Sequence, residues 1–150
     1  MDIIGPRSLN IAMLDAVARA ALGAATCGVS VGGGRSRIHL MNHNMPDQQR
    51  ASDVLNQIGA LPLRSTTSRL TIGDVDPVIS CRAELIAGDS ALAYLVLRGD
   101  EVIKRGQVDV VDSGLAWTLS DLTAGIHDVF LYRLTGNYAS GVVRIQVDPA

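Results

Sequence analysis

Aromatic residues are scarce in this chain of 150 residues, where one Trp, three Tyr and one Phe make up 3% of the sequence. So few aromatic side chains leave few groups to line a small-molecule pocket. A glycine period, sustained heptads and Ser/Thr/Pro tracts are also absent, which excludes collagen-like, coiled-coil and mucin-like proteins. Because 47% of the residues are hydrophobic and 19% are charged, the composition predicts a single globular domain over residues 1–150.

Neither sign of charge dominates, since 13 Lys and Arg stand against 15 Asp and Glu, for a formal net charge of -2 at pH 7. Lys104 is the only lysine, and the arginines are scattered along the chain. A nucleic-acid-binding protein needs a basic surface that attracts phosphates from a distance. The charge pattern therefore predicts no nucleic-acid partner.

Cysteine is rare and long apolar runs are missing. Cys27 and Cys81 lie far apart and form no CxxC pair. The segment Met1–Arg7 lacks the basic start and apolar run of a secretory signal, and no segment approaches the roughly 20 apolar residues that cross a bilayer. We therefore expect a reducing compartment, the cytoplasm, and no membrane partner.

The segment Leu9–Leu22 has the composition of a helix, because it is rich in alanine and holds no Gly or Pro. Ser8 is placed to cap its start and Gly23 to end it. Its polar residues form a narrow stripe, so the helix is expected to be buried on most sides. A sheet of the same domain or a second subunit would provide that cover.

Residues 35–41 alternate in polarity, which predicts a strand with Ser36, Ile38 and Leu40 on one face. The glycines Gly32–Gly34 precede this strand. We interpret them as a flexible loop that joins the helix to the sheet.

The first 41 residues are thus predicted to form the N-terminal helix and first strand. Residues 42–68 are polar and marked by proline, and we expect an extended connector or arm there, with a short helix over Gln48–Ile58 closed by Gly59. A connection of this length is uncommon inside a compact domain unless it serves as a binding arm or lid.

From Arg69 onward apolar and polar residues alternate with a period of two, and turn-forming residues separate the runs. Short strands at such even spacing are typical of a sandwich or small barrel. The predicted fold class is mainly β (α+β), with an antiparallel β-sandwich, immunoglobulin-like or jelly-roll-like, over residues 69–148. The expected strands are Val78–Ala87, Leu92–Arg98, Val102–Lys104, Gln107–Val111, Ala116–Leu119, Ile126–Leu134 and Ala139–Val147.

The alternation also predicts which side chains face the core. In Val78–Ala87 it places Cys81 on the inner face, where a free cysteine serves as a small apolar side chain. In the last strand Val143, Ile145 and Val147 alternate with polar residues, so the register of that strand is well specified.

Two short motifs resemble known binding sites but fit turns better. The run GVSVGGGRS at Gly28–Ser36 lacks the GxxxxGK[ST] pattern of a phosphate loop, because Val29 and Arg35 stand where Gly and Lys are needed. A strand also follows it, where a phosphate loop needs a helix. Arg98-Gly99-Asp100 spells a cell-adhesion tripeptide, but its residues suit the two-residue loop of a hairpin.

The three histidines do not predict a metal site. His39 and His43 lie near Asp47 in the sequence, but we expect them on a strand and in the loop that follows it. His127 stands apart from them, next to Asp128 in another strand. A zinc site needs three or four convergent ligands and at most two are seen, so no metal and no cofactor are predicted.

No catalytic residue is predicted either. The nucleophile elbow GxSxG does not occur, and Ser113-Gly114 and Ser140-Gly141 are interpreted as turn or bulge residues. We therefore expect that the protein is not an enzyme and takes no small-molecule substrate. Counting residues leaves a spatial serine triad open, because its members need not be close in sequence.

Four segments follow one another in an informative order: the helix SLNIAMLDAVARAAL, the strand SRIHLMNHNMP, the segment SDVLNQIGALPL and the hairpin ALAYLVLRGDEVIKRGQV. This order resembles that of small structural proteins of tailed-bacteriophage virions. In that family a helix of the form LDAIxxxL and a strand of the form xIxLYxGxxP precede a compact β-sandwich. The present sequence departs from the family in reading HLMNHNMP where an aromatic residue and a glycine are usual.

The resemblance implies a non-enzymatic structural component of the virion, assembled in the host cytoplasm. We expect a capsid cement or decoration protein that bridges capsid subunits, with the major capsid protein or tail proteins as partners and a homo-oligomeric state. One alternative is a small tail or baseplate protein. Another is a β-sandwich binding module or hydrolase, whose site would be formed by loop residues such as Asp89, Asp112 and Asp121.

Overall fold

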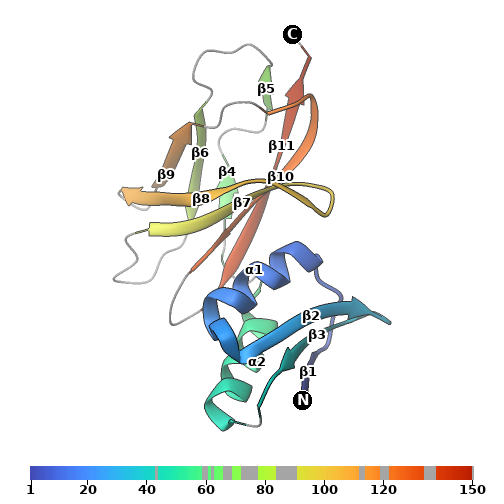
Figure 1. The fold of residues 1–150 in the computed structure, drawn as a ribbon. Coiled ribbons are helices and arrows are strands. Elements are labelled where there is room, and N and C mark those ends of the chain that lie inside the picture. The colour runs from blue at the N-terminus through green and yellow to red at the C-terminus, as the bar shows by residue number, and fades with distance from the viewer. Residues whose placement is uncertain are drawn as a thin grey trace. The chain divides into compact units, whose positions relative to one another are not determined.

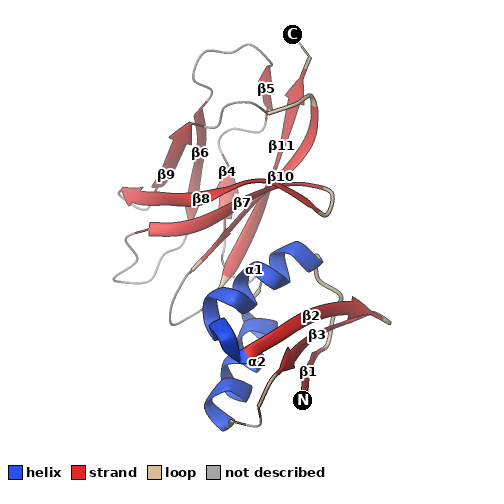
Figure 2. Cartoon of the chain, in the orientation of Figure 1, coloured by secondary structure: helices blue, strands red, loops and turns tan. Residues whose placement is uncertain are grey.

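The computed structural model describes residues 1–42, 44–58, 61, 63–65, 69–71, 78–83, 91–111, 114–118, 122–133 and 138–149. It is dominated by strands and contains two α-helices, so the mainly β (α+β) class predicted from the sequence is confirmed (Figure 2). Where the composition predicts one domain, the chain divides into two compact units. The first comprises Met1–Ala60 and Tyr132–Ser140, and the second comprises Leu61–Leu131 and Gly141–Ala150.

The first unit is a three-stranded sheet with both helices on one of its faces (Figure 1). The strand order is β1-β3-β2, and β3 pairs antiparallel with both neighbours. Its elements are β1 (Asp2–Gly5), α1 (Ile11–Leu22), a short 3-10 helix (Gly23–Ala25), β2 (Thr26–Gly32), β3 (Arg35–Leu40) and α2 (Met45–Gln57).

Helix α1 begins two residues later than predicted, because Asn10 and not Ser8 caps it. The Asn10 Oδ1 atom accepts hydrogen bonds from the amides of Ala12 at 3.0 Å and Met13 at 3.2 Å. The end predicted at Gly23 is confirmed, since its φ of 54° is a conformation that favours glycine. Only one face of the helix is fully buried, not most sides as expected, and it consists of Leu14, Val17, Ala18 and Leu22.

The predicted alternation in β3 is confirmed, with Ser36, Ile38 and Leu40 buried beneath the helices. The glycines before it have a different role from the one expected. Gly33 and Gly34 have φ values of 60° and 74° and form the two-residue turn of the β2–β3 hairpin, which requires positive φ at both positions. The sequence-based interpretation of a loop between helix and sheet was wrong, because β2 already belongs to the sheet.

Helix α2 confirms the short helix predicted within residues 42–68, although it begins at Met45. It buries Ala51, Val54 and Leu55 in the first unit. The approach to the sheet is close, because a Cβ built on Gly5 of β1 would lie 3.2 Å from the Cβ of Leu55. The segment expected to be an extended arm therefore supplies part of a core.

A segment distant in sequence completes this unit. The amide of Tyr138 donates to Oε1 of Gln57 at 2.6 Å, and the amide of Arg133 donates to the carbonyl of Ala139 at 3.2 Å. Tyr138, Ala139 and Arg133 are all buried.

The second unit is built on eight strands that are hydrogen-bonded in the order β4-β6-β9-β8-β7-β10-β11-β5. The expected antiparallel pairing holds for β4–β6, β6–β9, β9–β8 and β8–β7, whereas β5 runs parallel to β11. The strands are β4 (Leu63–Ser65), β5 (Arg69–Thr71), β6 (Val78–Ala83), β7 (Ala91–Arg98), β8 (Glu101–Val111), β9 (Gly114–Thr118), β10 (Gly125–Tyr132) and β11 (Ser140–Asp148).

Two strands predicted around Arg105-Gly106 are one continuous strand, β8. Gly106 pairs with Tyr94 of β7, and a Cβ at Gly106 would lie 2.9 Å from the Tyr94 hydroxyl oxygen. The glycine therefore makes room for the Tyr94 ring to lie across β8 and does not break the strand. The predicted hairpin loop at Gly99-Asp100 is confirmed, since Arg98 and Glu101 pair across it and Gly99 has a φ of 63°.

The last strand has the predicted alternation, because Val143, Ile145 and Val147 are buried and the residues between them are exposed. The neighbouring β10 contributes Val129, Phe130 and Leu131 to the buried residues. The prediction that Cys81 faces the core concerns a side chain that lies outside the described part of the structure.

Candidate functional site

The face of the three-stranded sheet that the helices leave uncovered carries polar residues from all three strands. Asp2 of β1 pairs with His39 of β3, and Ser30 of β2 pairs with Arg37, two residues before His39. Since alternate residues of a strand share a face, all four side chains lie on the same side of the sheet.

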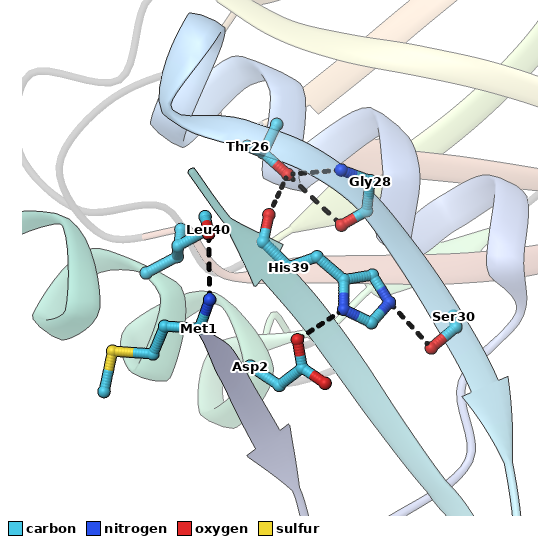
Figure 3. A network of polar contacts seen from close by, with 7 residues as sticks. All are labelled: Met1, Asp2, Thr26, Gly28, Ser30, His39 and Leu40. Atoms are coloured by element: carbon cyan, nitrogen blue, oxygen red, sulfur yellow. Dashed lines mark hydrogen bonds and ion pairs between the residues drawn. The ribbon is translucent and has the colours of Figure 1, made fainter. Parts of the chain in front are cut away.

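Asp2, His39 and Ser30 form a continuous polar network (Figure 3). The Nδ1 atom of His39 lies 2.6 Å from Oδ1 of Asp2, and its Nε2 atom lies 3.1 Å from Oγ of Ser30. Because a carboxylate only accepts hydrogen bonds, Nδ1 donates to Asp2. In the neutral imidazole Nε2 then accepts the hydrogen bond of the Ser30 hydroxyl.

The strand register explains both contacts. Leu40 exchanges hydrogen bonds with Met1, at 2.8 Å from its amide and 3.1 Å to its carbonyl, so the adjacent pair Asp2–His39 is a non-hydrogen-bonded pair with close side chains. On the other side His39 pairs with Gly28. Since Gly28 has no side chain, the imidazole has room to extend towards Ser30.

A bulge in β2 lies beside the network. The register shifts between Thr26 and Gly28, so one extra residue is accommodated there. The Thr26 Oγ1 atom accepts from the Gly28 amide at 3.2 Å and lies 3.3 Å from the carbonyls of both Gly28 and His39, so its single hydroxyl proton can go to either one. The hydroxyl thus fixes the backbone on both sides of the bulge (Figure 3).

Electrostatics favour the ionised carboxylate in the network. The hydrogen bond from His39 is the largest cause that lowers the pKa of Asp2 below its ordinary value of 3.8, and the charges of His39, the Met1 ammonium and Arg37 act in the same direction. The side chains of Asp2 and His39 remain 49% and 32% exposed, so water screens these charges.

The order carboxylate, imidazole and hydroxyl is that of a serine-hydrolase triad, with both distances inside hydrogen-bonding range. The carboxylate orients the imidazole, and Nε2 can take the proton of the Ser30 hydroxyl. The same contacts also join the three strands at one point. The arrangement can therefore activate a nucleophile or fix the register of the sheet.

Sequence reasoning missed this site, since it singled out His39 as a weak metal candidate and did not weigh Asp2 or Ser30. His43 lies outside the described residues, and Asp47 contacts Arg50 at 3.3 Å in α2. The structure thus gives His39 and Asp47 different partners. In the described part of the chain, no group of three His, Cys, Asp or Glu residues is arranged to hold a metal ion.

His127 was expected on a strand apart from the other histidines, and it lies on β10. Its side chain is fully buried, with Nδ1 3.3 Å from the carbonyl of Gly125, and Nε2 has no hydrogen-bond partner among the described residues. Burial is the largest cause that lowers its pKa below the ordinary value of 6.5, and the charge of Arg98 adds to it. The carbonyl of Gly125 and the charge of Asp128 oppose this shift.

Gly28–Ser36 spans the β2–β3 hairpin, and the strand expected after the glycines is confirmed. Arg98 of the Arg98-Gly99-Asp100 loop donates from Nη1 to Oγ1 of Thr123 at 2.8 Å. Asp89, Asp112 and Asp121, named for the site of the alternative binding module or hydrolase, lie outside the described residues, as does Ser113. Among the described helices, none is long and apolar enough to span a membrane.

No protein-family model matches the chain, and none of the curated proteins is similar to it. Among solved structures, the complex of Porphyromonas gingivalis RgpB pro- and mature domains is similar at a TM-score of 0.41 and 9% identity, over 59% of this chain and 19% of that one. The Arg-specific cysteine proteinase gingipain R has the same score and identity over 59% and 18%. An engineered protein matches at 0.37 and 13% identity, over 80% and 30%. The chain thus spans less than a third of each structure, and these likenesses carry no inference about function.

Proposed function

We propose that the chain is a non-enzymatic structural component of a tailed-phage virion, namely a capsid cement or decoration protein that bridges capsid subunits. The observation that supports this best is the division into two compact units, each with buried residues of its own. A protein that bridges two neighbours needs two contact surfaces, and separate units can provide one each. The segment order that resembles small virion proteins points the same way.

Both units expose apolar side chains that such contacts would bury. Met41 and Met45 of the first unit are 69% and 71% exposed, and Ile126 and Val142 of the second unit are 53% and 50% exposed. Burial of apolar surface stabilises an interface by roughly 25 cal/mol per Å² before the entropic cost of association. A tail or baseplate location remains the alternative within this proposal, and it would use the same surfaces in a small symmetric ring.

The test compares purified phage particles that carry the chain with particles whose gene for it is deleted. We expect deleted particles to lose their contents at a lower temperature, and added purified chain to restore the wild-type value. The Met41→Glu/Met45→Glu variant should fail to restore it, whereas Asn56→Glu, which alters another exposed position of α2, should restore it. Equal thermal stability with and without the chain would contradict a cement function.

A second candidate function is favoured by the Asp2–His39–Ser30 geometry: hydrolysis of a small, activated ester. The Ser30 Oγ atom would attack the carbonyl carbon while Nε2 of His39 takes the hydroxyl proton. That proton would pass to the departing alkoxide, and a water molecule activated by the same nitrogen would release the acid from Ser30. The exposed position of the network suits a substrate that needs little enclosure.

This second candidate is tested with p-nitrophenyl acetate and mass spectrometry of the quenched protein. Hydrolysis at Ser30 requires an acetyl group on that residue and a rate that falls at least about tenfold in Ser30→Ala and in His39→Asn. A rate unchanged in Ser30→Ala would remove the candidate, and Ser36→Ala serves as a serine control on the opposite face of the sheet.

A further inference from the structure

Strand β2 has an edge with which no strand in the described part of the chain pairs, since the order of its sheet is β1-β3-β2. The hydrogen bonds between Leu40 and Met1 show which backbone groups of β3 face β1 and which face β2. Even-numbered residues of β3 bond to β1, so Arg37 and its partner Ser30 bond to each other. The amides and carbonyls of Val29 and Val31 consequently point away from β3, along the outer edge.

This edge differs from the other sheet edges of the protein. Strands β4 and β5, at the edges of the second unit, have three residues each, and β1 has four residues with a charged Asp2 at its start. Strand β2 has seven residues, Thr26–Gly32, with no charged residue and no proline. Proteins protect edges with short strands, charges, prolines or bulges, and β2 has only the bulge between Thr26 and Gly28, at its start.

The sequence of the edge is symmetric. Gly28-Val29-Ser30-Val31-Gly32 reads the same in both directions. If two copies of β2 pair antiparallel about a two-fold axis at Ser30, Val29 of each copy lies opposite Val31 of the other. These are the residues whose amides and carbonyls point outward, so each pair exchanges two backbone hydrogen bonds.

Side chains are also complementary in this register. Ser30 faces its own counterpart in a non-hydrogen-bonded pair, where side chains are closest, and the small serine side chain fits there. The two valine pairs join β-branched side chains that are half-buried in the single chain. The glycines at both ends add no side chain that could clash.

We propose that β2 is a homodimerisation edge, through which two copies of the chain form one continuous six-stranded antiparallel sheet with the axis at Ser30. A second copy is the occupant that fits, because a two-fold interface requires a surface complementary to itself, and this strand has that property. The inference goes beyond the proposed function and does not depend on it.

The first test is sedimentation equilibrium of the full chain from micromolar to near-millimolar concentration. We expect a monomer–dimer equilibrium that Val31→Pro abolishes, because proline removes an outward amide that β3 does not use. Val31→Thr keeps both the amide and the branched shape and should still dimerise. A monomer at every concentration, or a dimer that persists in Val31→Pro, would overturn the proposal.

If Val31→Pro does not fold, a disulfide cross-link provides a second test of the pairing about Ser30. In a background with Cys27→Ala and Cys81→Ala, Ser30→Cys should form a disulfide-linked dimer on oxidation, because residues on the axis bring their Cβ atoms within disulfide range. Arg37→Cys, on the same face but one strand away from the axis, should remain monomeric. Equal cross-linking at the two positions, or none at Ser30→Cys, contradicts pairing about Ser30.

Discussion

Asp2 and His39 are 37 positions apart in the sequence, yet Oδ1 of the first lies 2.6 Å from Nδ1 of the second. The contact joins the first strand of the chain to the central strand of its sheet. It also lowers the pKa of Asp2, so the folded state favours the ionised carboxylate.

A change at His39 tests the cause of this shift. In His39→Asn we expect the Asp2 carboxyl to titrate at a higher pH than in the wild type, because its main stabilising hydrogen bond is lost. The measurement is the Asp2 carboxyl carbon shift in NMR as pH falls. An unchanged midpoint would show that the Met1 ammonium and Arg37 are sufficient to lower the pKa.

The same shift has a defined effect on stability. Because the folded pKa of Asp2 is below the unfolded value near 3.8, the stabilisation is present above that value and is lost as pH falls through the folded pKa. The wild type should lose unfolding free energy as pH falls, and Asp2→Asn should remove part of that loss, as measured by urea unfolding. Asp15→Asn removes a carboxylate outside the network and should retain that part.

Ser36 connects β3 to the segment that leads into α1. Its Oγ atom accepts from the Leu9 amide at 2.9 Å and donates to the Arg7 carbonyl at 2.9 Å, and the side chain is fully buried. Ser36→Ala leaves both backbone groups without this partner, so we expect a loss of about 1–3 kcal/mol in urea unfolding followed by circular dichroism. Ser30→Ala, on the uncovered face, should cost less than Ser36→Ala. Equal losses would contradict the buried role of Ser36.

The start of α1 provides a paired comparison. Asn10→Ala removes the acceptor for the amides of Ala12 and Met13, and should cost about 1 kcal/mol of unfolding free energy. Ser8→Ala should change stability by no more than about 0.5 kcal/mol, because Ser8 does not cap the helix. If urea unfolding showed a larger loss in Ser8→Ala than in Asn10→Ala, Ser8 would be the cap, as the sequence predicts.

His127 makes the stability of the second unit depend on pH. Its folded pKa is below the unfolded value near 6.5, so stability is complete above that value and declines as pH falls towards the folded pKa. The loss is at most about 1.4 kcal/mol per pH unit. His127→Leu removes the titrating group and the buried Nε2, and should flatten the dependence as pH falls below the unfolded pKa of 6.5.

The readout for this prediction is the fluorescence of Trp117, the only tryptophan, which lies on β9 of the second unit. His39→Asn, in the first unit, should leave the slope unchanged. Equal slopes in the wild type and His127→Leu would show that His127 does not cause the dependence.

Local features of the fold were predictable where a single residue type determines the backbone. Gly23 ends α1 and Gly99 forms a hairpin loop, because both positions have positive φ. The alternation in β3 and β11 was also predictable, since one face of each strand is buried and the other is exposed.

Features that depend on distant partners were not predictable. Gly106 was interpreted as a break between strands because nothing nearby shows that Tyr94 covers it. The short strand β1 has no alternation of its own and forms against β3. The Asp2–His39–Ser30 network joins three strands, so its discovery required their register as well as the residue types.

Quantitative mass spectrometry of purified particles tests most directly our proposal that this chain is a structural part of a virion. A cement protein of the head should be present in a fixed ratio to the major capsid protein, whereas a tail or baseplate protein should be present in few copies of cyclic symmetry. Absence of the chain from particles whose producing cells contain it would contradict the claim.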